Sequence, residues 1–242
     1  MSVIPAFLVH PFHVAYGAAR AFGNRCTAAL TIFTLGLGVS VAPVSAEALR
    51  LVALGDSLTQ GYGLPTEDGF VPQLEAWLHE NGLEVEVINA GVSGDTTAGG
   101  LARMDWTLAE PVDAMLVTLG GNDLLRGLDP AASRANLEAI LARLEREEIP
   151  AMLIGLPAPG NYGPEFKLAF ERMYVDLAGQ FDVPMVPNFM QPMTDKADAG
   201  ASFNDLMQDD HIHPNAEGVK LIVEHLGPEV LSFLKSLENG TY

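Results

Sequence analysis

Short apolar runs alternate with longer amphipathic stretches along most of the chain after residue 50. Five runs of three to six residues are mostly apolar: residues 51–54, 85–89, 114–119, 151–156 and 185–187. Runs of this length and composition predict strands that are buried on both faces, which is the pattern of a parallel sheet.

Helical periodicity fills the segments between these runs. The clearest helix is predicted over residues 129–148, where Asp129 suits the N-cap and Pro130 the first helical position. Its apolar residues fall on one stripe, formed by Leu137, Ile140, Leu141 and Leu144. Further helices are predicted over residues 70–78, 165–180 and 215–226.

The regular alternation of strands and helices predicts a single-domain, three-layer α/β/α sandwich around a central, mainly five-stranded parallel sheet. The last predicted helix is interrupted at Gly227-Pro228. Because crossovers between parallel strands are right-handed, the carboxyl ends of all strands meet at one edge of the sheet. In open α/β sheets this edge carries the ligand, so residues that do chemistry are expected directly after strands.

Residues 1–46 have the composition of an export signal rather than of a folded domain. They contain no acidic residue, two arginines and then an apolar stretch over residues 28–44 that ends in Val44-Ser45-Ala46. The small residues at its end resemble a signal-peptidase site, so we expect cleavage after Ala46 and a hydrolase domain over residues 47–242. A membrane anchor is the other interpretation, but glycines and a proline interrupt the stretch and it falls short of the roughly 20 residues that a spanning helix needs. The mature protein is therefore expected in the periplasm or outside the cell, without a stable membrane anchor.

The charge of the mature part argues against several classes of partner. The two leader arginines leave 11 of the 13 Lys and Arg residues against all 31 Asp and Glu residues, a formal net charge of −20. Such a surface repels the phosphates of nucleic acids and of anionic membranes. The only cysteine, Cys26, lies in the leader. Disulfides, a thiolate nucleophile and cysteine metal sites are thus excluded for residues 47–242.

Polar residues follow the predicted strands or precede the last predicted helix. They are Gly55-Asp56-Ser57, "NAGVSGDTT" at 89–97, "GGND" at 120–123, "LPAPGNYG" at 156–163 and "DDHIHPN" at 209–215. Each segment alone is typical of a turn or a helix cap. Their gathering along one edge of the sheet is what favours a catalytic site.

These residue types match the requirements of nucleophilic ester cleavage. A serine hydroxyl such as that of Ser57 needs a base, usually a histidine whose other ring nitrogen is held by a carboxylate. Asp210 and His213 are three residues apart, close enough in a helical turn to lie side by side, and Pro214 suits the first position of a following helix. The oxyanion needs preorganised N–H donors. Gly94, Asn122 and the amide of Ser57 are the candidates.

In these same segments the chain resembles the SGNH/GDSL hydrolases, whose named blocks supply Ser, Gly, Asn and His. The matching phrases are "GDSLTQGYG", "GVSGDTT", "GGND" and "DDHIHPN". The phrases "SGDTTAGGLARM", "LGGNDLLRG" and "LPAPGNYG" are similar to the group of multifunctional bacterial thioesterase/protease/lysophospholipases and arylesterases. His211 departs from the family, which commonly has a small residue there, often glycine.

The resemblance implies an α/β serine hydrolase that cleaves carboxylic esters or thioesters of acyl groups through an acyl-enzyme, without a cofactor or a metal. It implies Ser57, Asp210 and His213 as the triad and Ser57, Gly94 and Asn122 as oxyanion donors. The loops after the third and fourth strands are expected to hold the acyl chain, through Leu124, Leu125, Pro157, Asn161 and Tyr162. The expected substrate is a small acyl ester or a lysophospholipid.

Two other functions remain open from the residues alone. Asp209, Asp210, His211 and His213, together with Asp56, are chemically suitable ligands for a divalent metal ion in a metal-dependent hydrolase. Alternatively, a non-enzymatic, flavodoxin-like module could bind phosphate or FMN in the glycine-rich loop after the first strand. In that module Asp56 would place a negative charge beside the phosphate.

Overall fold

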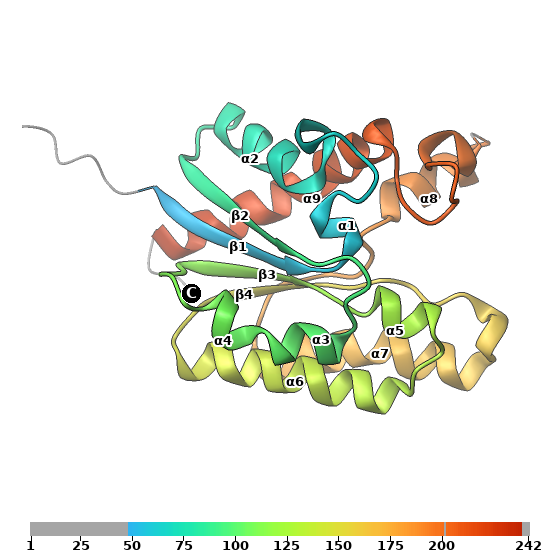
Figure 1. Ribbon diagram of the computed structural model, residues 1–242, viewed down its shortest axis with the longest axis horizontal. Coiled ribbons are helices and arrows are strands. Elements are labelled where there is room, and N and C mark those ends of the chain that lie inside the picture. Colours follow the sequence, from blue (N-terminus) through green and yellow to red (C-terminus); the bar gives the residue numbers. More distant parts are fainter. Residues whose placement is uncertain (1–47, 201, 239–242) are drawn as a thin grey trace, which may run out of the picture. The chain divides into compact units, whose positions relative to one another are not determined.

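Five parallel strands form one sheet in the order β2-β1-β3-β4-β5 (Figure 1). The strands are β1 (Leu49–Gly55), β2 (Val85–Gly91), β3 (Ala114–Thr118), β4 (Ala151–Ile154) and β5 (Met185–Val186). The computed structural model describes residues 48–200 and 202–238, so the expected leader and its cleavage point lie outside the described residues. The predicted α/β fold with a five-stranded parallel sheet is confirmed.

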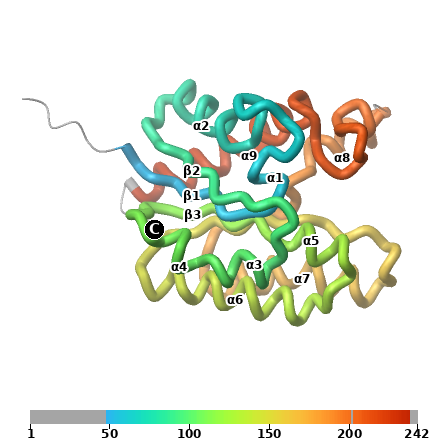
Figure 2. Tube along the Cα trace, in the orientation of Figure 1, coloured from blue at the N-terminus to red at the C-terminus, as the bar shows by residue number. Residues whose placement is uncertain are grey.

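Helices cover both faces of this sheet (Figures 1 and 2). One face carries α2 (Phe70–Glu80) and α9 (Ala216–Glu238), and the other carries α3 (Thr97–Ala102), α4 (Met104–Thr107), α6 (Pro130–Arg146) and α7 (Pro164–Phe181). Shorter elements lie in the connections: α1 (Ser57–Gln60), α5 (Gly121–Leu125), α8 (Gln191–Asp198) and the 3₁₀ helices η1 (Thr66–Asp68), η2 (Gly160–Tyr162) and η3 (Phe203–Leu206). Among the described helices, none is long and apolar enough to cross a membrane.

The two helical layers explain why the strands are nearly continuous apolar runs. In β1, Leu51 and Ala53 pack in the core cluster with α2 and α9, whereas Val52 and Leu54 pack in the cluster with α6 and α7. Successive side chains of a strand point to opposite faces, so a sheet covered on both sides needs apolar residues at every position. All four of these side chains are buried.

The predicted helix over residues 129–148 is confirmed as α6, with the expected start. The Asp129 side chain accepts a hydrogen bond of 2.9 Å from the Ala131 amide, and Pro130 is the first helical residue. The expected break in the last helix is wrong, because α9 continues through Gly227-Pro228. Pro228 and Glu224, whose carbonyl loses its helical donor, are both on the exposed side of α9. Gly227 is required by packing, since a Cβ atom there would lie 2.5 Å from Cε3 of Trp77.

The strand order positions the functional segments. The chain reverses its direction of winding between β1 and its neighbour β3, and doubly wound sheets form a crevice at such a point. The segment after β1 contains Ser57 and the segment after β3 contains Asn122. Both therefore lie at the edge of the sheet where the sequence predicted the site.

Candidate active site

Ser57 is the first residue of α1, directly after β1. The Asp56 side chain caps this short helix, accepting a hydrogen bond of 3.0 Å from the Leu58 amide. Thr59 is fully buried, which fixes α1 against the end of the strand. The nucleophile candidate is thus carried on a helical turn that is anchored by the residues on both sides of it.

Ser57, His213 and Asp210 form a continuous hydrogen-bonded relay. His213 Nε2 lies 2.8 Å from Ser57 Oγ, and His213 Nδ1 lies 2.6 Å from Asp210 Oδ2. Hydrogen bonds from the His213 ring and then from the backbone N–H groups of His213 and Ile212 lower the pKa of Asp210 to about 2. Asp210 is therefore an anion at neutral pH, Nδ1 of His213 carries the proton that it accepts, and Nε2 is free to take the hydroxyl proton of Ser57.

Asp210 and His213 lie on one loop between η3 and α9. Hydrogen bonds between the two ends of this loop close it. Met207 and Pro214 form an isolated antiparallel bridge, and the Gln208 amide donates to the His213 carbonyl at 2.8 Å. The expected position of Pro214 at the start of a helix is wrong, because α9 begins at Ala216. Instead, the side chain of Asn215 accepts from the Gly218 amide at 3.0 Å and caps the helix.

Contacts of Gln208 and His213 with Tyr62 hold this loop against the segment that follows α1. Gln208 Nε2 donates to the Tyr62 carbonyl at 2.8 Å and to the Pro214 carbonyl at 2.9 Å. The ring of Tyr62 lies against the ring of His213, with the centroids 4.7 Å apart. The loop is therefore tied to the segment that directly follows α1, the helix that carries Ser57.

The candidate oxyanion donors other than Ser57 lie after β2, for Gly94, and after β3, for Asn122. Gly94 has a φ of +84° in a turn that is closed by a 3.0 Å hydrogen bond from the Asp95 amide to the Val92 carbonyl. This left-handed conformation favours glycine, which explains the residue type at this position. Asn122 lies in α5, and its Nδ2 donates to Asp56 Oδ2 at 3.4 Å. That bond is long, so the amide is not tightly held by it.

The sequence named Asp56 as a candidate metal ligand, but it did not predict that this carboxyl is buried. Its side chain is only 2% exposed. Burial raises the pKa of this carboxyl to about 6 from an ordinary 3.8, although the hydrogen bonds from Leu58 and Asn122 act against the rise. A carboxyl in contact with a candidate oxyanion donor therefore titrates close to neutral pH.

A cavity of about 270 Å³ opens beside Ser57 and His213. Leu124, Leu125 and Pro157 line it, as the sequence suggested. Asn161 and Tyr162 are outside the lining: they lie in η2, where the Tyr162 hydroxyl donates to the Leu125 carbonyl at 3.3 Å. The lining also includes residues that the sequence analysis missed, namely Leu58, Gly121, Leu156, Met190, Thr194, Phe203 and Ile212.

The histidine and aspartate cluster does not form a ligand set. Within residues 48–200 and 202–238, no group of three or more His, Cys, Asp or Glu side chains is placed to hold a metal ion. Both ring nitrogens of His213 are engaged by Ser57 and Asp210. His211 is exposed and has a φ of +55°, a left-handed conformation that a glycine adopts without strain.

A doubly wound α/β sheet that presents a Ser–His–Asp relay next to an apolar cavity defines a serine hydrolase. The model of the GDSL-like lipase/acylhydrolase family matches residues 53–221. The chain belongs to this family. The order of Ser57 before Asp210 and His213 on a shared loop is consistent with that membership, and membership of a hydrolase family argues against the alternative of a non-enzymatic, flavodoxin-like module.

Relatives and solved structures agree with this assignment. The chain is 37% identical over 190 residues to esterase TesA of Pseudomonas aeruginosa, covering 78% of this chain and 91% of that protein. It is 35% identical over 188 residues to thioesterase 1/protease 1/lysophospholipase L1 of Escherichia coli, covering 77% and 85%. The crystal structure of AlinE4, an SGNH-hydrolase family esterase, matches with a TM-score of 0.63 and 42% identity, covering 77% of this chain and 97% of that one. The chain is a carboxylic ester hydrolase of the serine type.

Proposed function

We propose that Ser57, His213 and Asp210 hydrolyse acyl esters and thioesters through an acyl-enzyme. The single observation that carries the proposal is the relay of 2.8 Å and 2.6 Å that joins Ser57 Oγ to the Asp210 carboxylate through the His213 ring. It gives the serine a base within hydrogen-bonding reach and gives that base an anionic partner.

Acylation follows from this geometry. Ser57 Oγ attacks the carbonyl carbon of the ester while its proton moves to His213 Nε2, and Asp210 stabilises the imidazolium. The amides of Ser57 and Gly94 and the side-chain amide of Asn122 donate to the oxyanion of the tetrahedral intermediate. The intermediate collapses by breaking the bond to the alcohol or thiol, which leaves with the proton from Nε2. The acyl group remains on Ser57.

Deacylation repeats the same proton transfers with water. His213 Nε2 takes a proton from the water that attacks the acyl-enzyme, and then returns it to Ser57 Oγ as the carboxylate product leaves. Asn122 has to turn from Asp56 Oδ2 toward the oxyanion in both steps. The long 3.4 Å bond between these two groups makes that exchange inexpensive in free energy.

The cavity supports an acyl chain as the group that is held beside Ser57. Its walls carry the apolar side chains of Leu124, Leu125 and Leu156 and, from the last third of the chain, Met190 and Phe203. Relatives are named as an arylesterase, of Vibrio mimicus, and as a thioesterase and lysophospholipase. We therefore propose aryl esters, acyl thioesters and lysophospholipids as the substrate classes.

Export narrows the substrates that the protein meets. We propose that residues 1–46 are a signal peptide that is removed after Ala46 and that the enzyme acts in the periplasm or outside the cell, on the basis of the acid-free, apolar composition of this segment. Acyl-CoA is cytosolic, so lysophospholipids and other lipid or aryl esters are the more accessible substrates. The N-terminal sequence of the protein recovered from the periplasm tests the cleavage point, and a mature chain that starts at Met1 would disprove it.

The experiment that tests the activity is a hydrolysis panel of lysophosphatidylcholine, an acyl-CoA and short p-nitrophenyl esters. Wild-type protein is compared with Ser57→Ala and with His213→Ala. We expect turnover in the wild type on at least one class and its loss in both variants. Wild-type rates in Ser57→Ala would refute Ser57 as the nucleophile, whichever substrate class is hydrolysed.

A further inference from the structure

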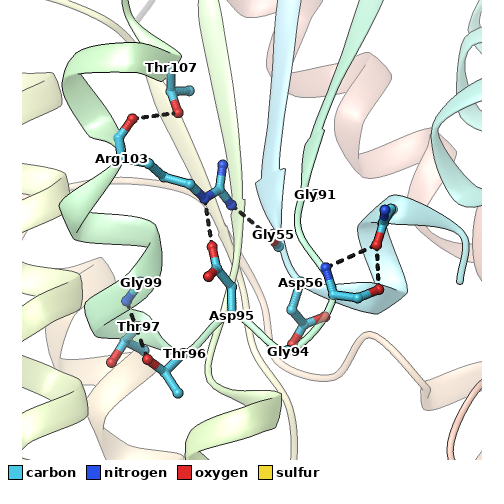
Figure 3. Close-up of polar contacts among 12 residues, drawn as sticks. Gly55, Asp56, Gly91, Gly94, Asp95, Thr96, Thr97, Gly99, Arg103 and Thr107 are labelled. Atoms are coloured by element: carbon cyan, nitrogen blue, oxygen red, sulfur yellow. Dashed lines mark hydrogen bonds and ion pairs between the residues drawn. The ribbon is translucent and has the colours of Figure 1, made fainter.

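Arg103 reaches from the end of α3 to two groups beside the site (Figure 3). Its Nε donates to Asp95 Oδ2 at 2.6 Å, and its Nη2 donates to the Gly55 carbonyl at 2.8 Å. The Arg103 and Asp95 side chains are only 14% and 18% exposed. Gly55 is two residues before Ser57 in the chain, and Asp95 directly follows Gly94.

The Gly55 carbonyl is a shared attachment point. It accepts a second hydrogen bond, of 3.1 Å, from the amide of Val92, the first residue of the turn that contains Gly94. Arg103 holds the last residue of this turn through the Asp95 carboxylate. One guanidinium therefore ties the carboxyl end of the nucleophile strand to the turn that presents a proposed oxyanion donor.

Two other side chains contact the same turn from the solvent side. Gln60 Oε1 accepts from the Ser93 amide at 2.9 Å, and Arg126 Nη2 donates to the Gly94 carbonyl at 2.9 Å. Gln60 and Arg126 are both exposed. Of the three side chains Gln60, Arg103 and Arg126, Arg103 is the most buried, and it also donates to the Gly55 carbonyl at the end of β1.

The chemistry of Arg103 fits a geometric task. A guanidinium is planar and directs several N–H donors in fixed directions, whereas a lysine ammonium is a single flexible point charge. Arg103 Nη1 is buried and has no partner in the part of the chain that the structure describes.

We propose that Arg103 is a positioning residue of the oxyanion hole: it fixes the turn of residues 92–95, and with it the Gly94 amide, relative to Ser57. The inference rests on the proposed roles of Ser57 and Gly94. Oxyanion donors stabilise the transition state only when they are preorganised, and a displacement of about 1 Å at a reacting centre costs on the order of 10²-fold in rate. Loss of Arg103 removes one restraint on that geometry without removing a group that contacts the substrate.

The test compares Arg103→Met with Arg143→Met. Arg143 also pairs with two carboxylates, Asp105 at 2.9 Å and Glu147, but neither is in the 92–95 turn or next to Ser57. For a p-nitrophenyl ester we expect Arg103→Met to lower kcat by about 10- to 100-fold, in line with a loosened donor, while KM stays within about threefold. Arg143→Met is expected to keep wild-type kcat.

An inhibitor that forms a tetrahedral adduct provides a measurement that would not change if the role of Arg103 were purely structural. An alkyl trifluoromethyl ketone forms a tetrahedral adduct with the serine and places an oxyanion in the hole, whereas the carboxylate product does not. We expect Arg103→Met to weaken the binding of the ketone by the same factor by which it lowers kcat. The inhibition constant of the carboxylate product is expected to stay unchanged. Arg103→Lys is expected to recover part of the loss, since it keeps a cation at Asp95 but not the second contact to Gly55.

Several results would overturn the inference. One is wild-type kcat in Arg103→Met when Ser57→Ala is inactive. This result would overturn the inference even if the melting temperature of Arg103→Met falls. Another is a loss of kcat in Arg103→Met with unchanged inhibition by the ketone. If Arg103→Met does not fold, Asp95→Asn is measured in the same way, and wild-type kcat in that variant overturns the inference. Activity in Ser57→Ala would instead refute the proposed function.

Discussion

The buried carboxyl of Asp56 makes the stability of the protein fall as the pH rises from 4 to 6. Its pKa is about 6 in the folded protein, because of burial, and 3.8 is the ordinary value for an exposed aspartate. Between these values the folded state keeps a proton that the unfolded state has released. Folding is therefore favoured at the acidic end of this window, and that advantage is lost as the pH passes 6.

The magnitude follows from the difference between the two pKa values, which corresponds to about 3 kcal/mol of unfolding free energy. No large correction for solvent is needed, because the side chain is 2% exposed. Asp210 contributes in the opposite sense and at lower pH: its depressed pKa of about 2 gives stability that is lost only below about pH 4. The two groups are thus separated along the pH axis.

The assay is urea unfolding of the wild type and of Asp56→Asn at several pH values between 4 and 8. The asparagine cannot ionise, and its side-chain oxygen can still accept from the Leu58 amide that now bonds to Asp56 at 3.0 Å. The difference between the two proteins cancels the other titrating groups. We expect wild-type stability relative to the variant to fall by about 2 kcal/mol from pH 4 to pH 8, because part of the full difference of about 3 kcal/mol is already lost at pH 4, where the unfolded aspartate is partly ionised. A difference that is constant with pH would show that this carboxyl is already ionised at pH 4, and would refute the reasoning from burial.

Three further substitutions test individual contacts. Asn122→Ala should lower kcat by about 10²- to 10³-fold in the p-nitrophenyl ester assay, as the loss of one oxyanion donor does, and a change below threefold would remove Asn122 from the oxyanion hole. His211→Gly should raise the unfolding free energy by roughly 0.5–1 kcal/mol in urea, because the left-handed φ of +55° is strained for histidine, and no gain would mean that the loop tolerates the side chain without strain. Asp123→Ala should lower the unfolding free energy by roughly 3–5 kcal/mol, because the buried carboxylate accepts hydrogen bonds from the amide and hydroxyl of Thr97 and from the hydroxyl of Ser133. Wild-type stability of that variant in the same titration would contradict the contacts.

The strands were predictable because burial on both faces leaves a local signature. The segments 51–54 and 114–119 are apolar at nearly every position, and β1 and β3 lie there. The ends of strands were less predictable: the apolar run 151–156 continues to Leu156, but β4 ends at Ile154. Leu156 is apolar because it lines the cavity and packs in the core beyond the end of the strand, and not because it belongs to the sheet. Composition does not distinguish these two reasons for an apolar side chain.

The site was predictable where function constrains residue type, and less so where it depends on folding. Ser57, Asp210 and His213 stand out because few residue types can act as nucleophile, acid and base. The contact of Arg103 with Gly55 joins residues 48 positions apart and has no local signature. Trp77 against Gly227 is a contact of the same kind, and it explains why position 227 is a glycine inside α9. Asn161 and Tyr162 follow a strand, as cavity residues often do, but their segment folds as η2 outside the lining.

The loop that carries Asp210 and His213 has a consequence for regulation and for evolution. Because its hydrogen bonds from Gln208 to His213 and from His213 to Asp210 are internal, the imidazole keeps its orientation and tautomer wherever the loop moves as a rigid piece. The catalytic contact across to the rest of the protein is the 2.8 Å separation between Nε2 and Ser57 Oγ, which lies beside the Gln208 bond to the Tyr62 carbonyl and the contact between the Tyr62 and His213 rings. A small displacement of this loop from Ser57 would therefore interrupt the relay at Nε2 while the hydrogen bond between His213 and Asp210 stays intact, so sequence changes in the contacts that hold the loop are expected to alter turnover while every catalytic group is retained.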